Sequence, residues 1–174
     1  LTMAFSKTDC RQNFSSAAED ALNAQINAEL CASYIYRSMA DFFAHCDVAL
    51  SGFREKFLHD AEEETEHAQK MISYMSMRGG RVKLSAIAAP KQSWATPLEA
   101  LEDALALEKD VNAKLLALHA IADEAKDPQM CDWIEGEFLG EQVEAIYSLA
   151  KQITNLKRVG GGLGLYMFDK DVSA

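Results

Sequence analysis

Apolar residues recur at alternating steps of three and four positions along four long stretches of this chain, as they do on one face of an α-helix. The first stretch covers residues 16–43, and the second covers residues 51–78. The third begins at residue 96, and the fourth runs from residue 127 to the glycines at 160–162. The pattern therefore predicts four long amphipathic helices.

Capping residues mark where three of these helices begin. Ser16 and Glu19 have the spacing of a capping box, in which each side chain satisfies a backbone amide of the first turn. The segments Thr96–Glu99 and Asp127–Pro128 each place a capping side chain directly before a proline, which suits the first helical position. Within the fourth helix, we expect Gly136 and the nearby Gly140 to be weak points.

Residues 79–95 carry no helical pattern, and a segment of this length needs a structural reason. A second helix of about 28 residues is about 42 Å long at about 1.5 Å per residue. The segment can span roughly 56 Å at about 3.3 Å per residue, so it can return along the whole bundle. The fold class predicted is all-α: a four-helix bundle with one long crossover between the second and third helices, plus a short fifth helix at residues 163–168.

Each predicted helix has a polar interruption on its apolar stripe. The residues concerned are Glu29, Glu64 with His67, Glu108, and Gln142. A buried carboxylate must be paired, protonated or bound to a metal, and a single one is often only part of an ion pair. Four such positions at mid-bundle, without a lysine or arginine on the stripes, favour a metal site.

The ligand types indicate which metal this site suits. Glu64 and His67 lie three residues apart, so both side chains leave the same face of their helix. Carboxylate oxygens with an imidazole suit iron or manganese, and Glu64 can bridge two ions. Di-iron bundles combine a glutamate from each of two helices with Glu-x-x-His from each of the other two. Here the fourth helix has Gln142 and Ala145 instead of the second motif, so one half of the site is poorer in ligands.

Composition narrows the possible partners. The chain has 174 residues, 49% of them apolar, and a formal net charge of −10, which argues against nucleic acid and anionic membranes and suits a protein that handles cations. Its four cysteines have no CxxC spacing, so reduced thiols are expected. The sequence shows neither a secretory signal nor an apolar run of about 20 residues. We expect a cytoplasmic protein whose natural start is Met3.

Short motifs over nearly the whole chain can be compared with known families. They are Arg11–Phe14, Gln25–Leu30, Ala32–Tyr36, Glu63–Ala68, Arg78–Arg81, Leu107–Lys109, Asn155–Leu156 and Phe168–Lys170. Through these motifs the chain resembles the eukaryotic ferritins of the heavy-chain type, which oxidise iron. The resemblance implies a single ferritin-like di-iron domain over residues 1–174. It also implies self-assembly into a hollow shell of twenty-four subunits, homomeric or mixed, that stores ferric mineral.

The resemblance also implies a ferroxidase centre for two iron ions. Its tighter site would consist of Glu29, Glu64 and His67, and its weaker site of Glu64, Glu108 and Gln142. Tyr36 would donate a hydrogen bond to a ligand carboxylate or to an oxygen intermediate. The implied reaction oxidises two Fe(II) with O2 to a diferric oxo species and hydrogen peroxide. Fewer ligands on one ion suit a protein that must release its product.

Two outer groups of residues have both a functional and a simpler interpretation. By resemblance, one group faces the shell cavity. Mineral would nucleate at His59, Glu62 and Glu66, and Glu63 in the same group would also serve as a transit or third metal site. The alternative for this group is a solvated acidic face. A second group would line three-fold channels through which Fe(II) enters: His119, Asp132 and Glu135. The alternative for its two acids is favourable placement near a helix N-terminus.

Three other functions are alternatives to that of a ferroxidase. A storage-only ferritin of the light-chain type lacks the Glu64 and His67 pair. A non-storage di-iron oxidase should carry the second Glu-x-x-His motif, and Ala145 argues against it. A non-catalytic bundle that interacts through apolar faces would be monomeric and inert toward iron.

Overall fold

The computed structural model describes residues 10–172, and the expected start at Met3 lies outside them. Its elements are α1 (Ser16–Ala44), α2 (Ser51–Met77), α3 (Pro97–Glu124), α4 (Pro128–Ile134), the π-helical turn η1 (Glu135–Leu139), α5 (Gly140–Val159) and α6 (Leu163–Asp171). The elements α4, η1 and α5 follow one another without a break and form the fourth long helix. Within the described residues, no helix is both long and apolar enough to cross a membrane.

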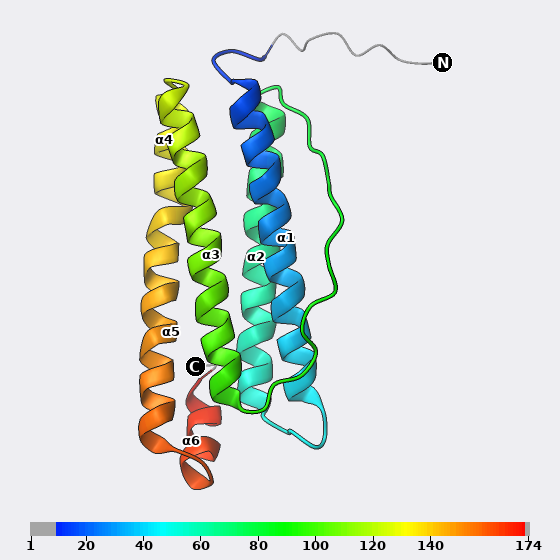
Figure 1. Ribbon diagram of the computed structural model, residues 1–174, viewed down its shortest axis with the longest axis vertical. Coiled ribbons are helices and arrows are strands. Elements are labelled where there is room, and N and C mark those ends of the chain that lie inside the picture. The colour runs from blue at the N-terminus through cyan, green and yellow to red at the C-terminus, as the bar shows by residue number, and fades with distance from the viewer. Residues whose placement is uncertain (1–9, 173–174) are drawn as a thin grey trace, which may run out of the picture.

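The long crossover between α2 and α3 is confirmed. Figure 1 shows residues 78–96 (green) returning beside α1 along the length of the bundle, so that α3 runs parallel to α2. Hydrogen bonds hold this segment to α1: the Asn23 side chain donates to the Arg81 carbonyl at 2.9 Å and accepts from the Lys83 amide at 2.6 Å. Further along, the Ser38 hydroxyl donates to the Lys91 carbonyl at 2.7 Å. These contacts supply backbone partners that an extended segment lacks by itself.

The start of α1 differs from the expectation. Ser15, not Ser16, is the N-cap, and its hydroxyl accepts from the Ala18 amide at 3.0 Å. Glu19 does not close a capping box; its carboxylate accepts from the Arg81 amide of the crossover at 2.9 Å and pairs with Arg11. The predicted capping box was wrong because the N-cap lies one residue earlier, so that Ala18 and not Glu19 takes the third helical position. The expected caps of α3 and α4, Thr96 and Asp127, are confirmed.

The hydrophobic core consists of two clusters along the bundle axis. One cluster contains Ile26, Met71, Val111 and Phe138, and the other contains Ala61, Ala104 and Leu149 together with the aromatic rings around Phe57. On α2, α3 and the fourth helix, the polar positions of the stripes fall between the residues of these two clusters. The candidate site therefore forms a polar layer across the middle of the bundle.

The fourth helix accommodates its buried residues by a local change of helix type. Ile134, Phe138 and Gln142 are all buried although they follow one another at steps of four. Two such steps overshoot two ideal turns by roughly 80°. The wider π-helical turn η1 reduces this drift, and it lies at the glycines expected to be weak points. The turn keeps Phe138 in the core while Gln142 still faces the polar layer.

The short fifth helix expected from the sequence is present as α6, which packs against the start of α2. Asp169 is 3% exposed, and its Oδ1 accepts from the Phe53 amide at 3.1 Å, which caps α2. A Cβ atom on Gly52 would lie 1.6 Å from the Asp169 carbonyl oxygen, so only glycine permits this approach. Phe168 also packs on Phe53, with ring centroids 5.7 Å apart. The C-terminal helix and α2 thus stabilise each other.

Replacing Asp169 with alanine should loosen α6. The substitution leaves a buried amide without its acceptor, so we expect the free energy of unfolding to fall by about 1–3 kcal/mol. Guanidinium unfolding would measure this loss, and limited proteolysis should release the C-terminal segment faster. The matched control is Lys170→Ala, at the exposed neighbouring position. Equal unfolding midpoints for the two variants would contradict the capping role.

Candidate metal centre

The first half of the site joins α1 and α2. Glu29, Glu64 and His67 each offer a ligand atom within 4.8 Å of the others. Glu29 is 1% exposed and Glu64 is 4% exposed. Within the described part of the chain, the Oε2 atom of each carboxyl group is buried without a hydrogen-bond partner. Buried carboxyl oxygens that lack a hydrogen-bond partner and lie beside an imidazole nitrogen suit the binding of a divalent cation.

The second half joins α3, α5 and α1 around Glu108. Gln142 Nε2 donates to Glu108 Oε2 at 3.0 Å and to the Glu108 carbonyl at 3.1 Å. The Tyr36 hydroxyl donates to Glu108 Oε1. Both carboxylate oxygens of Glu108 therefore already have neutral donors. A cation here must displace or share these donors, which makes the second half the weaker binder.

Both halves border one cavity of about 430 Å³. The buried side chains of Tyr36, Glu64, Glu108 and Gln142 contribute to its wall, and His67 lies beside them. Exposed carboxylates of α2 and α5, among them Glu63, form its rim. The cavity thus connects the buried ligands with solvent through an acidic opening that attracts cations.

Burial controls the protonation of the first half. Burial, with the nearby Glu108 and Asp60 carboxyls, raises the pKa of Glu64 to about 8, although a hydrogen bond with Glu29 acts in the opposite direction. Burial, and then the Glu64 carboxyl, raises the pKa of Glu29 well above its usual range. Burial and the Glu108 carboxylate likewise raise the pKa of Tyr36, so its phenol stays a neutral donor. Without metal, the paired carboxyls therefore hold protons at neutral pH.

Glu141 is a residue that the sequence interpretation missed. Its Oε2 lies 2.9 Å from His67 Nε2, while His67 Nδ1 faces Glu64 Oε2 at 3.5 Å. Phe138 packs edge-on against the imidazole, with centroids 5.7 Å apart. A carboxylate on the far nitrogen orients a ligating histidine and makes it a better donor. The one sequence signal for Glu141 is its position next to Gln142. This signal is weak, because neighbouring residues of a helix point to different faces.

A second omission is the ion pair between Lys56 and Asp60 in the cavity wall. Lys56 Nζ lies 2.7 Å from Asp60 Oδ2, and the two side chains are 12% and 16% exposed. Burial raises the pKa of Asp60, while Lys56 lowers it. The sequence interpretation found no cation on the apolar stripes, and Lys56 lies at the edge of its stripe. Because Asp60 takes up this cation, the nearby Glu29 and Glu64 carboxyls remain without one among the contacts described.

Comparison with known proteins decides the family. Residues 19–159 match the model of the ferritin family, a ferritin-like domain. The chain belongs to the ferritin family. It is 52% identical to soma ferritin of Lymnaea stagnalis over 167 residues, covering 95% of this chain and 96% of that protein.

Two heavy chains are similar at nearly the same level. The identity is 52% to ferritin heavy chain of Echinococcus granulosus, covering 92% of this chain and 94% of that protein. It is 50% to ferritin-1 heavy chain of Schistosoma mansoni, with 93% and 94% covered. The resemblance to eukaryotic ferritins of the heavy-chain type is thereby confirmed.

Beyond the cavity, this ferritin exposes the residues expected to nucleate mineral. His59 Nε2 lies 3.5 Å from Glu63 Oε1, and both side chains are exposed. Glu62 and Glu66 are exposed on the same helix. Only Glu63 of these four also lines the cavity, which fits its expected position between the buried ligands and the surface. Nucleation stays a prediction.

The residues expected in a three-fold channel lie near the junction of α3 with the fourth helix. His119 Nε2 lies 2.6 Å from Glu135 Oε1, and Asp132 is exposed. The Cys131 thiol is 4.0 Å from the His119 carbonyl oxygen, and burial raises its pKa. One subunit thus brings an imidazole and a carboxylate together at this surface. The channel stays a prediction because it requires neighbouring subunits.

Metal binding to this ferritin should release protons from its buried carboxyls. With a pKa of about 8, Glu64 is protonated at pH 7, so a bound cation must displace its proton. We expect the release per Mn²⁺, an ion that favours oxygen ligands, to decrease as the pH rises through 8, because the proton is then already lost. A pH indicator in weak buffer measures the release. It should be smaller in Glu64→Gln and unchanged in the exposed control Glu62→Gln; a release equal in all three proteins would contradict the assignment.

Removal of Glu141 should weaken the metal site without removing a buried ligand. Loss of a carboxylate that orients a ligating histidine typically costs about 10- to 100-fold in metal affinity. We expect a loss of this size in Glu141→Ala, measured by Mn²⁺ titration calorimetry on iron-free protein. Glu144→Ala is the matched control, since Glu144 lines the same cavity on the same helix. Equal losses in both variants would indicate a general effect of rim charge instead.

Proposed function

We propose that this chain is the subunit of an iron-storage shell that oxidises Fe(II) with O2 inside its own helical bundle. The observation that carries the proposal is the pair of buried carboxyls, Glu29 and Glu64, whose unpartnered oxygens meet His67 beside a cavity with an acidic rim. Similarity to ferritin heavy chains over nearly the full length supports it. Iron is the substrate here, and it leaves the centre after oxidation.

Two Fe(II) ions would bind in unequal sites. The first is held by Glu29, Glu64 and His67, and binding displaces the protons of the paired carboxyls. The second lies between Glu64 and Glu108, with Gln142 turning its amide oxygen toward the ion. Glu108 then gives up its present bond from the Gln142 amide nitrogen, while Tyr36 still donates to it. Glu64 thereby bridges both ions.

The reaction takes one electron from each iron. Two Fe(II) ions, one O2 and two protons give two Fe(III) ions and one hydrogen peroxide. The cavity of about 430 Å³ leaves space for O2 beside the ligands. Because both electrons come from iron in one centre, no one-electron oxygen species needs to leave the site.

Release of the ferric product follows from the sparse ligands of the second site. Ala145 occupies the position where a second histidine would retain the ion. The rim carboxylates Glu63, Glu141 and Glu144 offer successive oxygen ligands toward the surface. From there, the exposed group around Glu62 would nucleate mineral inside a shell of twenty-four subunits. Fe(II) would enter this shell through the three-fold channels at His119, Asp132 and Glu135.

The decisive test replaces the imidazole of the first site. We expect His67→Ala to slow the initial oxidation of Fe(II) by about tenfold or more, a loss of at least about 1.4 kcal/mol. The rate is measured as ferric absorbance after Fe(II) is added to iron-free, assembled protein in air. The control His59→Ala alters an exposed histidine on the same helix and should retain the initial rate.

Equal initial rates in His67→Ala and the parent would place oxidation on the mineral or the surface. The chain would then be a storage-only subunit. Sedimentation of the same samples tests the shell separately, since a stable monomer that takes up no iron would contradict the storage role in either case.

A further inference from the structure

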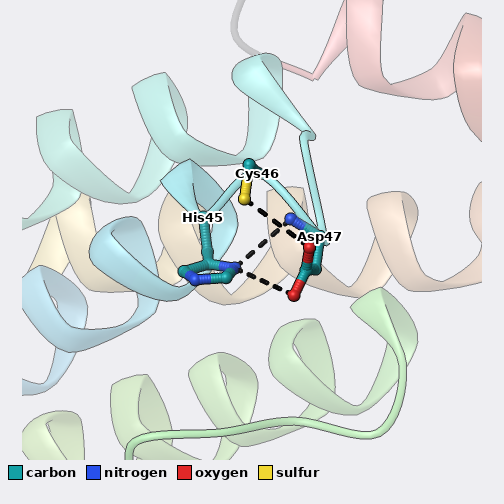
Figure 2. Close-up of side chains that lie close together, drawn as sticks. All are labelled: His45, Cys46 and Asp47. Atoms are coloured by element: carbon teal, nitrogen blue, oxygen red, sulfur yellow. Dashed lines mark hydrogen bonds and ion pairs between the residues drawn. The ribbon is translucent and has the colours of Figure 1, made fainter.

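The turn between α1 and α2 carries three metal-ligand side chains that the proposed iron centre does not use. They belong to the consecutive residues His45, Cys46 and Asp47, and all three are exposed. Figure 2 shows the imidazole, the thiol and the carboxylate directed toward one another on one side of the turn. Each offers a ligand atom within 4.8 Å of the other two.

Backbone hydrogen bonds hold this turn in shape. The His45 carbonyl accepts from the Val48 amide at 3.0 Å and from the Ala49 amide at 2.8 Å, and the Leu50 amide donates to the Phe43 carbonyl at 3.3 Å. Ala49 has a φ of 52°, which closes the turn. The three side chains therefore converge on a backbone that is already folded, so a bound ion would not have to order the loop.

The ligand atoms lie at or slightly beyond the spacing of a tetrahedral transition-metal site, with one Asp47 oxygen facing the thiol and the other facing the imidazole. Cys46 Sγ lies 3.5 Å from Asp47 Oδ1, and His45 Nδ1 lies 3.7 Å from Asp47 Oδ2. Zinc bonds of about 2.0 Å to nitrogen and oxygen and about 2.3 Å to sulfur place tetrahedral ligand atoms about 3.3–3.5 Å apart. The Asp47 amide donates to His45 Nδ1 at 3.2 Å, so the lone pair of this nitrogen faces Asp47, and a bound ion would displace the amide hydrogen bond.

We propose that His45, Cys46 and Asp47 form a second metal site, specific for Zn²⁺-like divalent transition metals. The sulfur ligand separates it in kind from the oxygen-rich centre, because thiolates favour softer ions than Fe(II) or Mg²⁺. Binding converts the Cys46 thiol to a thiolate and releases its proton to solvent. Three protein ligands leave a fourth position for water. The site lies roughly 24 Å along α1 from Glu29 at about 1.5 Å per residue, at one end of the bundle (Figure 1).

Cobalt(II) is the probe for this site, because a thiolate ligand gives it a charge-transfer absorption that oxygen and nitrogen ligands do not. Iron-free, assembled protein is titrated with Co²⁺ under reducing, anaerobic conditions. We expect a saturating thiolate band that Zn²⁺ abolishes, that Cys46→Ser eliminates, and that His45→Ala and Asp47→Asn each weaken at least tenfold in Co²⁺ affinity. The controls Cys10→Ser and Cys131→Ser each remove another free cysteine and should retain the thiolate band.

Three results would overturn the site. The first is the absence of a thiolate band in the parent, and the second is a band that survives Cys46→Ser or disappears in Cys131→Ser. The third is an unchanged affinity in both His45→Ala and Asp47→Asn, which would mean binding by a single thiolate. Initial Fe(II) oxidation by Cys46→Ser should equal that of the parent and confirms an intact assembly. This outcome is independent of the proposed iron centre, since a failed ferroxidase would not alter the band.

Discussion

The burial of carboxyl groups halfway along the bundle is the constraint on which the other features of this structure depend. Removing a carboxylate from water costs several kcal/mol unless a partner offsets it. Glu29 and Glu64 meet this cost by retaining protons, as their raised pKa values show. The two hydrophobic clusters on either side supply the stability that permits such a layer. A structure arranged in this way is poised to exchange protons for metal ions.

The chain topology serves this polar layer. The crossover at residues 78–96 makes α3 parallel to α2, which brings Glu108 to the level of Glu64. On the fourth helix, η1 absorbs the extra length between buried positions, so that Gln142 reaches Glu108 while Glu141 reaches His67. Each half of the layer thus depends on an irregular segment, and π-helical turns are often found at functional sites for this reason.

The sequence predicted features that depend on periodicity and missed those that depend on tertiary contacts. Apolar spacing and the caps at Thr96 and Asp127 were sufficient for the helices, their order and the buried polar positions. Glu19 was misassigned because the N-cap lies one residue earlier, and its partners, Arg11 and the Arg81 amide, lie outside its helix. Glu141 was missed because a regular helix turns it away from Gln142. The convergence of His45, Cys46 and Asp47 results from a turn whose hydrogen bonds no residue pattern reveals.

The two proposed metal sites differ in a way that the proposed chemistry requires. A centre that produces hydrogen peroxide would oxidise a thiolate ligand to sulfenic acid and beyond. Its ligands are accordingly oxygen atoms and one imidazole, and the first half contains no sulfur within the set that converges there. Cys46 lies in the exposed turn at the end of the bundle, where peroxide is diluted by solvent. Oxygen ligands in a buried layer would thus handle redox-active iron, while sulfur is restricted to a peripheral site for an ion such as Zn²⁺, which has no redox chemistry of its own.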